Sequence, residues 1–158
     1  MIRVGISEIK TASHPEILSS VGLGSCVGIC LYDPTIKVGG MAHVLLPSSK
    51  SGKIDGNPGK FADTAINALL QKLGEDGVLM KNIKAKLVGG ASMFAISDSN
   101  DSMFSMGPKN VAAAKNVLTS RGIKLDGEHT GGSQGRTVEF HVGTGRVVIK
   151  TMVCTTEI

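Results

Sequence analysis

Glycine limits how this chain can fold more than any other residue does. The sequence holds 21 glycines and 5 prolines among 158 residues, and three of the glycines interrupt the charge-free apolar segment Val21–Tyr32. Glycine favours turns and weakens helices, whereas a membrane-spanning helix needs roughly 20 consecutive apolar residues. We therefore expect short buried strands joined by turns, and no insertion into a membrane.

Length and composition predict a single folded domain over residues 1–158. An apolar fraction of 41% beside a charged fraction of 19% supplies a core and excludes a disordered chain. The first residues, Met1–Gly5, lack the basic and apolar segments of a secretory signal. The sequence therefore predicts a cytoplasmic protein.

Cysteine and charge patterns argue against metal and nucleic-acid sites. The three cysteines, Cys26, Cys30 and Cys154, lack the spacing of a zinc site, so we expect free thiols and no metal. Lys and Arg are scattered, and one Tyr without any Trp leaves little to stack on bases, so we expect no nucleic-acid partner. The net charge of +4 fits an acidic partner and fits a solubility role equally well.

Two glycine motifs resemble nucleotide sites only in part. Gly22-Leu23-Gly24 lacks the third glycine of the dinucleotide motif. Gly59-Lys60 is followed by Phe61 instead of the Ser or Thr of a P-loop. We therefore expect no organic cofactor.

Hydrophobic periodicity predicts more strands than helices. Period-two alternation and runs rich in Val and Ile predict strands, whereas apolar residues three and four apart predict helices. The order of these elements predicts an α+β fold in which mixed β-sheets are layered with two main helices. The first expected helix spans 62–73, the second starts near Pro108, and Ser97–Ser102 is expected to be a turn. The expected strands are Arg3–Ser7, Glu16–Val21, Cys26–Tyr32, Val38–Leu46, Ile83–Val88, Ile123–Glu128, Val138–Val142 and Arg146–Val153.

Cys26 is the candidate nucleophile. It follows a glycine turn where a strand restarts, so we expect an exposed sulfur with backbone N–H groups of Gly24, Ser25 or Cys26 as an oxyanion hole. A free cysteine is mostly protonated near neutral pH, so the chemistry needs a base, and a neighbouring imidazolium would lower the thiol pKa. Cys30 lies deeper in the apolar run and is expected to be structural, and Cys154 receives no role.

His43 is the candidate base among four histidines. His14 and His141 lie in polar surroundings, whereas His43 lies inside an apolar strand, where an imidazole needs a polar partner. One turn separates this strand from the strand of Cys26, so the two strands are expected to pair. A buried cysteine and a strand histidine are also common as ordinary core residues, and at this point both interpretations stay open.

Several motifs in order along the chain carry a family resemblance. They are Gly22–Val27, Cys30–Pro34, Gly39–His43, Gly89–Phe94, Thr130–Gly132 and Gly135–Phe140, together with Pro47, Gly107 and Asn110. Over nearly its whole length the chain resembles the chemoreceptor glutamine deamidase family called CheD. The resemblance implies a cytoplasmic chemotaxis enzyme with a fold similar to those of cysteine-dependent deamidases.

The resemblance also implies a catalytic set. The family's cysteine falls on Cys26, its histidine on His43, and its third residue, usually Thr, on Ser20. Serine keeps the hydroxyl but lacks the methyl group that stiffens χ1, so the bond that orients the histidine is expected to be less fixed. Ser20 as an ordinary polar residue at a strand end remains the alternative, and Ser19 would point the other way.

The resulting hypothesis is a protein-glutamine deamidase acting on methyl-accepting chemotaxis receptors through a thioester on Cys26. The resemblance implies receptor methylesterase activity in some members, and a CheC-type phosphatase as a partner. The alternative is a non-catalytic adaptor that docks onto and regulates that phosphatase. Its surface would comprise Gly89–Phe94 and Ser97–Met106, with Met93, Phe94, Met103 and Phe104, although such side chains more often belong to a core.

Overall fold

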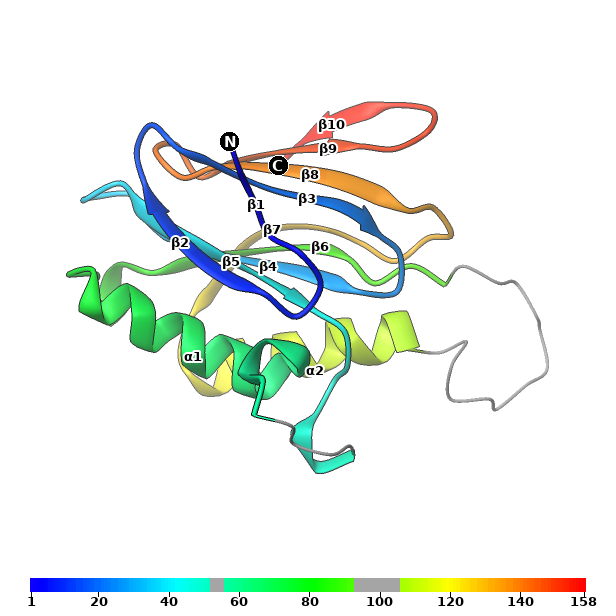
Figure 1. Ribbon diagram of the computed structural model, residues 1–158, viewed down its shortest axis with the longest axis horizontal. Helices are drawn as coiled ribbons and strands as arrows, with labels where there is room; N and C mark the ends of the chain where they lie inside the picture. The colour runs from blue at the N-terminus through cyan, green and yellow to red at the C-terminus, as the bar shows by residue number, and fades with distance from the viewer. Residues whose placement is uncertain (52–55, 93–105) are drawn as a thin grey trace.

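The chain is arranged in three layers. The computed structural model describes residues 1–51, 56–92 and 106–158, and within them the chain forms two stacked five-stranded sheets and two α-helices (Figure 1). Both helices cover the outer face of one sheet, and the outer face of the other sheet carries none of them. The α+β fold with mixed sheets and two main helices, predicted from the sequence, is confirmed.

The first sheet carries the N-terminal strand and the C-terminal strands. Its order is β1-β3-β8-β9-β10, in which β1 runs parallel to β3 and the other neighbours are antiparallel. Alternate residues of β8 are buried, as period-two patterning requires for a sheet with one covered face. The strands are β1 Ile2–Arg3, β3 Ile17–Leu23, β8 Arg136–His141, β9 Arg146–Lys150 and β10 Thr155–Glu157.

The second sheet lies between the first sheet and the helices. Its order is β2-β5-β4-β6-β7, with β6 and β7 parallel and the other pairs antiparallel. Because both faces are covered, every residue of β4 is buried and the strand reads as a nearly continuous apolar run. The strands are β2 Ile9–Ser13, β4 Val27–Asp33, β5 Val38–Val44, β6 Lys84–Gly89 and β7 Lys124–Thr130.

Two hydrophobic clusters follow from the alternation along β4. Val27, Ile29 and Leu31 face the helices α1 (Ala62–Glu75) and α2 (Met106–Ser120). Cys26 and Cys30 face the first sheet, in a cluster with side chains of β3, β8 and β9. Short 3₁₀ turns, η1 Ser49–Ser51, η2 Pro58–Lys60 and η3 Met80–Asn82, flank α1. The residues that the sequence singles out therefore lie between the two sheets.

Several boundaries differ from the sequence prediction, mostly at sheet edges. The predicted strand Arg3–Ser7 shortens to β1, because Ser7 adopts a positive φ of 62° and turns the chain into β2. The strands β2 and β10 are not predicted, since their half-exposed residues show little apolar alternation. The predicted strand Arg146–Val153 ends at Lys150, and the predicted turn Ser97–Ser102 lies outside the described residues.

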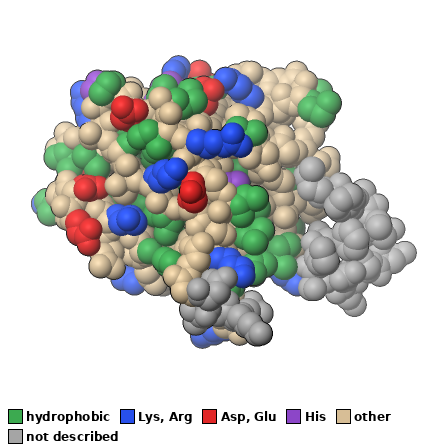
Figure 2. Space-filling view, viewed as in Figure 1, with side chains coloured by type: hydrophobic (Ala, Val, Ile, Leu, Met, Phe, Trp, Pro, Cys, Tyr) green, Lys and Arg blue, Asp and Glu red, His purple; other side chains and the backbone are tan. Residues whose placement is uncertain are grey.

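The surface mixes charges of both signs. On the face drawn in Figure 2, Lys and Arg side chains are interspersed with Asp and Glu and with apolar groups. Among the described residues, four ion pairs join Lys or Arg to Glu and a fifth joins the N-terminal amino group to Glu16. Most of the partners are exposed, so each pair contributes little to stability. In the described part of the chain, no helix is long and apolar enough to cross a membrane.

Candidate active site

Cys26 lies in the turn that leads from β3 into β4. Gly22 has a φ of +74°, which glycine adopts without strain, and the chain reverses over the next residues so that Cys26 immediately precedes β4. The expectation of an exposed sulfur is wrong, because Cys26 is only 8% exposed. The first sheet packs over it, and the residue belongs to the cluster between the sheets.

The predicted pairing of the Cys26 and His43 strands is confirmed. In the antiparallel ladder of β4 and β5, Val27 lies opposite Val44 and Gly28 lies opposite His43. Extending this register by one residue places Cys26 on the same sheet face as His43, as its diagonal neighbour. Diagonal neighbours are roughly 7–8 Å apart, within reach of long side chains. Gly28 places no side chain between them.

His43 is buried and held by the opposite sheet. It is 2% exposed, and its Nδ1 lies 2.7 Å from Oγ of Ser20 on β3. Ser20 is itself fully buried, and its hydroxyl donates to the carbonyl oxygen of Val4 at 2.9 Å. The expected contact between Ser20 and His43 is therefore present, and it spans the interface between the two sheets.

This chain of hydrogen bonds fixes the tautomer of His43. A serine hydroxyl has one proton, and a carbonyl oxygen can only accept, so the proton of Ser20 goes to Val4. Ser20 Oγ must then accept from His43, which places the ring proton on Nδ1. In the neutral ring Nε2 is consequently the proton acceptor. Nε2 is buried and has no hydrogen-bond partner among the described residues.

Burial favours the neutral forms of Cys26 and His43. Desolvation raises the pKa of the Cys26 thiol, although a bond from its own backbone N–H opposes this. Desolvation lowers the pKa of His43, against smaller opposing effects from the Val4 backbone and the charge of Glu8. The expectation that an imidazolium lowers the thiol pKa is therefore not met. Among the described residues no hydrogen bond joins the thiol to the ring, whose Nε2 has no partner. The strand register brings the two residues to diagonal positions, and these pKa directions favour a neutral thiol and a neutral imidazole, which can act as a general base.

The backbone before Cys26 can supply donors to an oxyanion. The carbonyls of Gly24 and Cys26 accept from the amides of Ala91 and Gly90, each at 2.8 Å. Within residues 1–51, 56–92 and 106–158, the N–H groups of Gly24 and Ser25 donate to no backbone carbonyl. These N–H groups are the oxyanion donors that the sequence predicts, and they remain candidates for that role.

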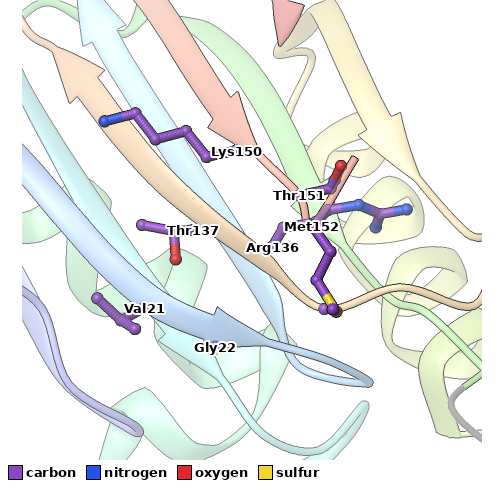
Figure 3. A pocket seen from close by; sticks show the side chains of 8 residues that line it. Val21, Gly22, Arg136, Thr137, Lys150, Thr151 and Met152 are labelled. Atoms are coloured by element: carbon purple, nitrogen blue, oxygen red, sulfur yellow. The ribbon is translucent and has the colours of Figure 1, made fainter. Parts of the chain in front are cut away.

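Several surface hollows lie near the turn that carries Cys26. One, of about 370 Å³, is lined by residues of β3, β8 and β9, by Gly135 before β8 and by the turn after β9, with Val21, Thr137 and Met152 among them (Figure 3). None of the three candidate catalytic residues lines it, so we do not place the reaction there. A smaller hollow of about 240 Å³ is lined by Ser25, Leu45 and Leu46, which lie close to Cys26 and His43 in sequence, and by Met106 of α2.

The remaining titratable candidates lie apart from this arrangement. Cys30 is fully buried, with a pKa raised to about 12 by desolvation, and Cys154 is exposed. His14 is exposed, and His141 is half-buried beside Arg146. In the described part of the chain, no group of three His, Cys, Asp or Glu side chains is placed to hold a metal ion. Most of the surface predicted for an adaptor, residues 93–105, lies outside the described residues.

Sequence reasoning missed two contributors to this geometry. The carbonyl of Val4 is a backbone group, which no residue-type pattern can indicate. Asn110 of α2 is fully buried and donates to the carbonyls of Ser25 and Leu45. A signal for Asn110 was available: it lies at helical spacing on the buried stripe with Ala114 and Leu118, where a polar side chain needs a partner.

Comparisons with known proteins agree on one family. The family described as "CheD chemotactic sensory transduction" matches residues 45–151. A probable chemoreceptor glutamine deamidase CheD of Caldanaerobacter subterraneus subsp. tengcongensis is 44% identical over 96% of this chain and 93% of its own. The chemoreceptor glutamine deamidase CheD of Thermotoga maritima is 44% identical over 93% of this chain and 89% of its own. That of Halalkalibacterium halodurans is 43% identical over 96% and 94%.

Proposed function

The chain belongs to the CheD family of chemoreceptor glutamine deamidases, and from this premise we propose that Cys26, His43 and Ser20 carry out its reaction. The enzyme is an amide hydrolase that converts glutamine side chains of chemoreceptors to glutamate and releases ammonia. The observation that carries the proposal is the hydrogen-bond chain from His43 Nδ1 through Ser20 to Val4, which leaves Nε2 as the proton acceptor.

The first half of the reaction forms a thioester. Nε2 of His43 takes the thiol proton as Sγ of Cys26 attacks the carbonyl carbon of the glutamine amide. The amide oxygen becomes an oxyanion, and N–H groups of Gly24, Ser25 or Cys26 stabilise it. Removing one such donor from comparable sites lowers the rate roughly 10²–10³-fold. Protonated His43 then gives its proton to the departing nitrogen, and ammonia leaves.

The second half returns the enzyme to its starting state. Neutral His43 takes a proton from water as the water oxygen attacks the thioester carbon. The carbon–sulfur bond breaks, the proton returns to Sγ, and a glutamate side chain is released. Each cycle therefore consumes one amide and one water and produces one carboxylic acid and one ammonia. Ser20 takes no proton, and it keeps the imidazole in the tautomer that both halves require.

A methyl ester of a receptor glutamate would follow the same route, with methanol in place of ammonia as the leaving group. We include methylesterase activity in the proposal because the attacking group and the proton carrier would be unchanged. A CheC-type phosphatase as a partner stays an implication of the family resemblance, and the adaptor role and action in the cytoplasm stay predictions.

Mass spectrometry of a receptor signalling fragment tests the proposal. Incubation with the protein should add about one dalton for each converted glutamine, since an NH₂ group is replaced by OH. Cys26→Ala and His43→Ala should abolish the gain. The matched control is Cys154→Ala, which changes an exposed thiol outside the site and should keep the activity. Full activity in Cys26→Ala or His43→Ala would end the proposal.

A further inference from the structure

Asn110 joins the two chain segments that carry Cys26 and His43. It lies in the second turn of α2 and is fully buried. Its side-chain Nδ2 donates to the carbonyl oxygen of Ser25 at 2.9 Å and to that of Leu45 at 3.1 Å. Ser25 directly precedes Cys26, and Leu45 follows His43 by two residues. One amide group therefore bridges both segments.

The two hydrogen bonds from Asn110 lie just beyond the last paired residues of β4 and β5. β4 begins at Val27 and β5 ends at Val44, so the carbonyls of Ser25 and Leu45 lie just beyond the paired residues. Among the described residues, only Asn110 donates a hydrogen bond to either carbonyl. Without it, two adjacent segments would end in unpaired carbonyls and would be free to separate.

The helix that carries Asn110 is itself fixed against the Cys26 segment. A Cβ added to Gly107 of α2 would collide with the carbonyl oxygens of Gly90 and Ala91, so the helix backbone lies directly on that turn. The same turn donates from Gly90 N to Cys26 O and from Ala91 N to Gly24 O. The turn and Asn110 together hold the residues before and at Cys26 from two sides.

We propose that Asn110 is a positioning residue that sets the separation between Sγ of Cys26 and the imidazole of His43. This inference rests on the proposed function. Proton transfer needs donor and acceptor within hydrogen-bond reach, and a displacement of about 1 Å can cost roughly 10²-fold in rate. Asn110 touches no reacting atom, so it acts only through the backbone that it holds.

The main test replaces the amide with an apolar group of similar shape. Asn110→Leu removes both donors while keeping the branching at Cγ. We expect kcat for receptor deamidation to fall roughly 10–10²-fold with little change in KM. Asn110→Gln retains both donors on a longer stem and should recover part of the loss. The matched control is Asn116→Leu, the same change at an exposed position of the same helix, which should leave kcat unchanged.

A second readout does not require receptor deamidation. In a Cys154→Ala background, iodoacetamide labelling of Cys26 is followed across pH. If His43 lies within reach of the thiol, its ionisation should change the labelling rate of Cys26 below neutral pH, which adds a second pH-dependent limb to the plot of rate against pH. Asn110→Leu should lose that limb and keep the limb of the thiol itself. If the parent protein shows the limb but no deamidation, the proposed function fails while the positioning role stands.

The inference is overturned if Asn110 proves to have a purely structural role. Asn110→Leu would then lower the melting temperature but show the parent kcat for the folded enzyme and the parent labelling profile. If circular dichroism shows that Asn110→Leu does not fold, Asn110→Ser takes its place. Serine offers one donor, so a kcat that is lower than that of the parent but higher than that of the Cys26→Ala variant supports the role. Parent kcat in a destabilised Asn110→Ser refutes it.

Discussion

At the scale of single residues, the geometry of the candidate site follows from the small number of protons on the Ser20 hydroxyl and the His43 ring. The one hydroxyl proton of Ser20 is committed to Val4, and this forces the His43 ring to donate from Nδ1. Residue types and one short turn make a pair of Cys26 and His43 feasible, and the family resemblance singles out that pair and adds Ser20. The polarity of the bonds could not be predicted, because it depends on a backbone carbonyl 16 residues away in sequence.

Ser20 tests this assignment directly. Ser20→Ala should lower kcat roughly 10–10²-fold, because His43 loses the acceptor that selects its tautomer. It should also lower the free energy of unfolding by about 1–3 kcal/mol, since the Val4 carbonyl is left buried and unpaired. Ser20→Thr keeps the hydroxyl and adds the methyl group that fixes χ1, so its kcat should equal or exceed that of the parent. Deamidation kinetics and urea unfolding measure both effects.

Ser19→Ala is the control for this series. Ser19 neighbours Ser20 on β3, so its side chain points to the opposite face of the sheet. The change should leave kcat intact. Equal kcat in Ser20→Ala, Ser20→Thr and the parent would show that Ser20 is a bystander.

At the scale of elements, the end of β6 supports the turn that carries Cys26. Gly89 closes β6 with a φ of +109°, and a Cβ there would collide with the carbonyl oxygen of Cys26. Arg136 of β8 donates to the Gly89 carbonyl from Nη1 at 2.7 Å and to the Gly131 carbonyl from Nη2. The first sheet therefore holds the end of β6 in place, and β6 holds the Cys26 turn.

Gly89→Ala should disturb both stability and catalysis. The left-handed φ strains any L side chain, and the collision must push the Cys26 backbone aside. We expect a loss of about 1–3 kcal/mol in the free energy of unfolding and roughly a 10–10²-fold fall in kcat. Thermal unfolding and deamidation kinetics on the same preparation give the two quantities.

Gly77→Ala separates strain from collision. Gly77 has a comparable φ of +89° but open space around its Cβ direction, in a turn after α1. The Gly77→Ala variant should have a lower free energy of unfolding and the kcat of the parent. If Gly89→Ala behaves in the same way, the close approach of β6 to Cys26 has no catalytic consequence.

At the scale of the whole molecule, local patterns predict the fold class better than the assembly of the sheets. The strands β3, β4, β5, β6 and β8 follow from period-two alternation or from apolar runs, and both helices follow from their apolar spacing. The edge strands β2 and β10 depend on partners supplied by distant parts of the chain. The stacking of the two sheets that joins Ser20 to His43 is equally non-local. Neither arrangement leaves a periodic trace in the sequence.

Stacking two sheets around thiols has a consequence for stability at alkaline pH. Desolvation raises the pKa of Cys30 from 9.0 to about 12, and it also raises the pKa values of Cys26 and Tyr32. Between about pH 9 and 12 the unfolded chain loses protons that the folded chain keeps, so the free energy of unfolding falls as pH rises. Well below pH 9 Cys30 is protonated in both states, so it adds no pH dependence to the free energy of unfolding.

Urea unfolding between about pH 8 and 10.5 measures this decline. Cys30→Ala should make the decline shallower, because a titrating group is removed from the core, although the small cavity lowers stability at every pH. Cys154→Ala, which changes the exposed thiol, should keep the parent slope. A Cys30→Ala variant with an unaltered slope would mean that the space between the sheets admits water to the thiol. The same space would then solvate Cys26 and His43, which contradicts the neutral resting pair on which the mechanism depends.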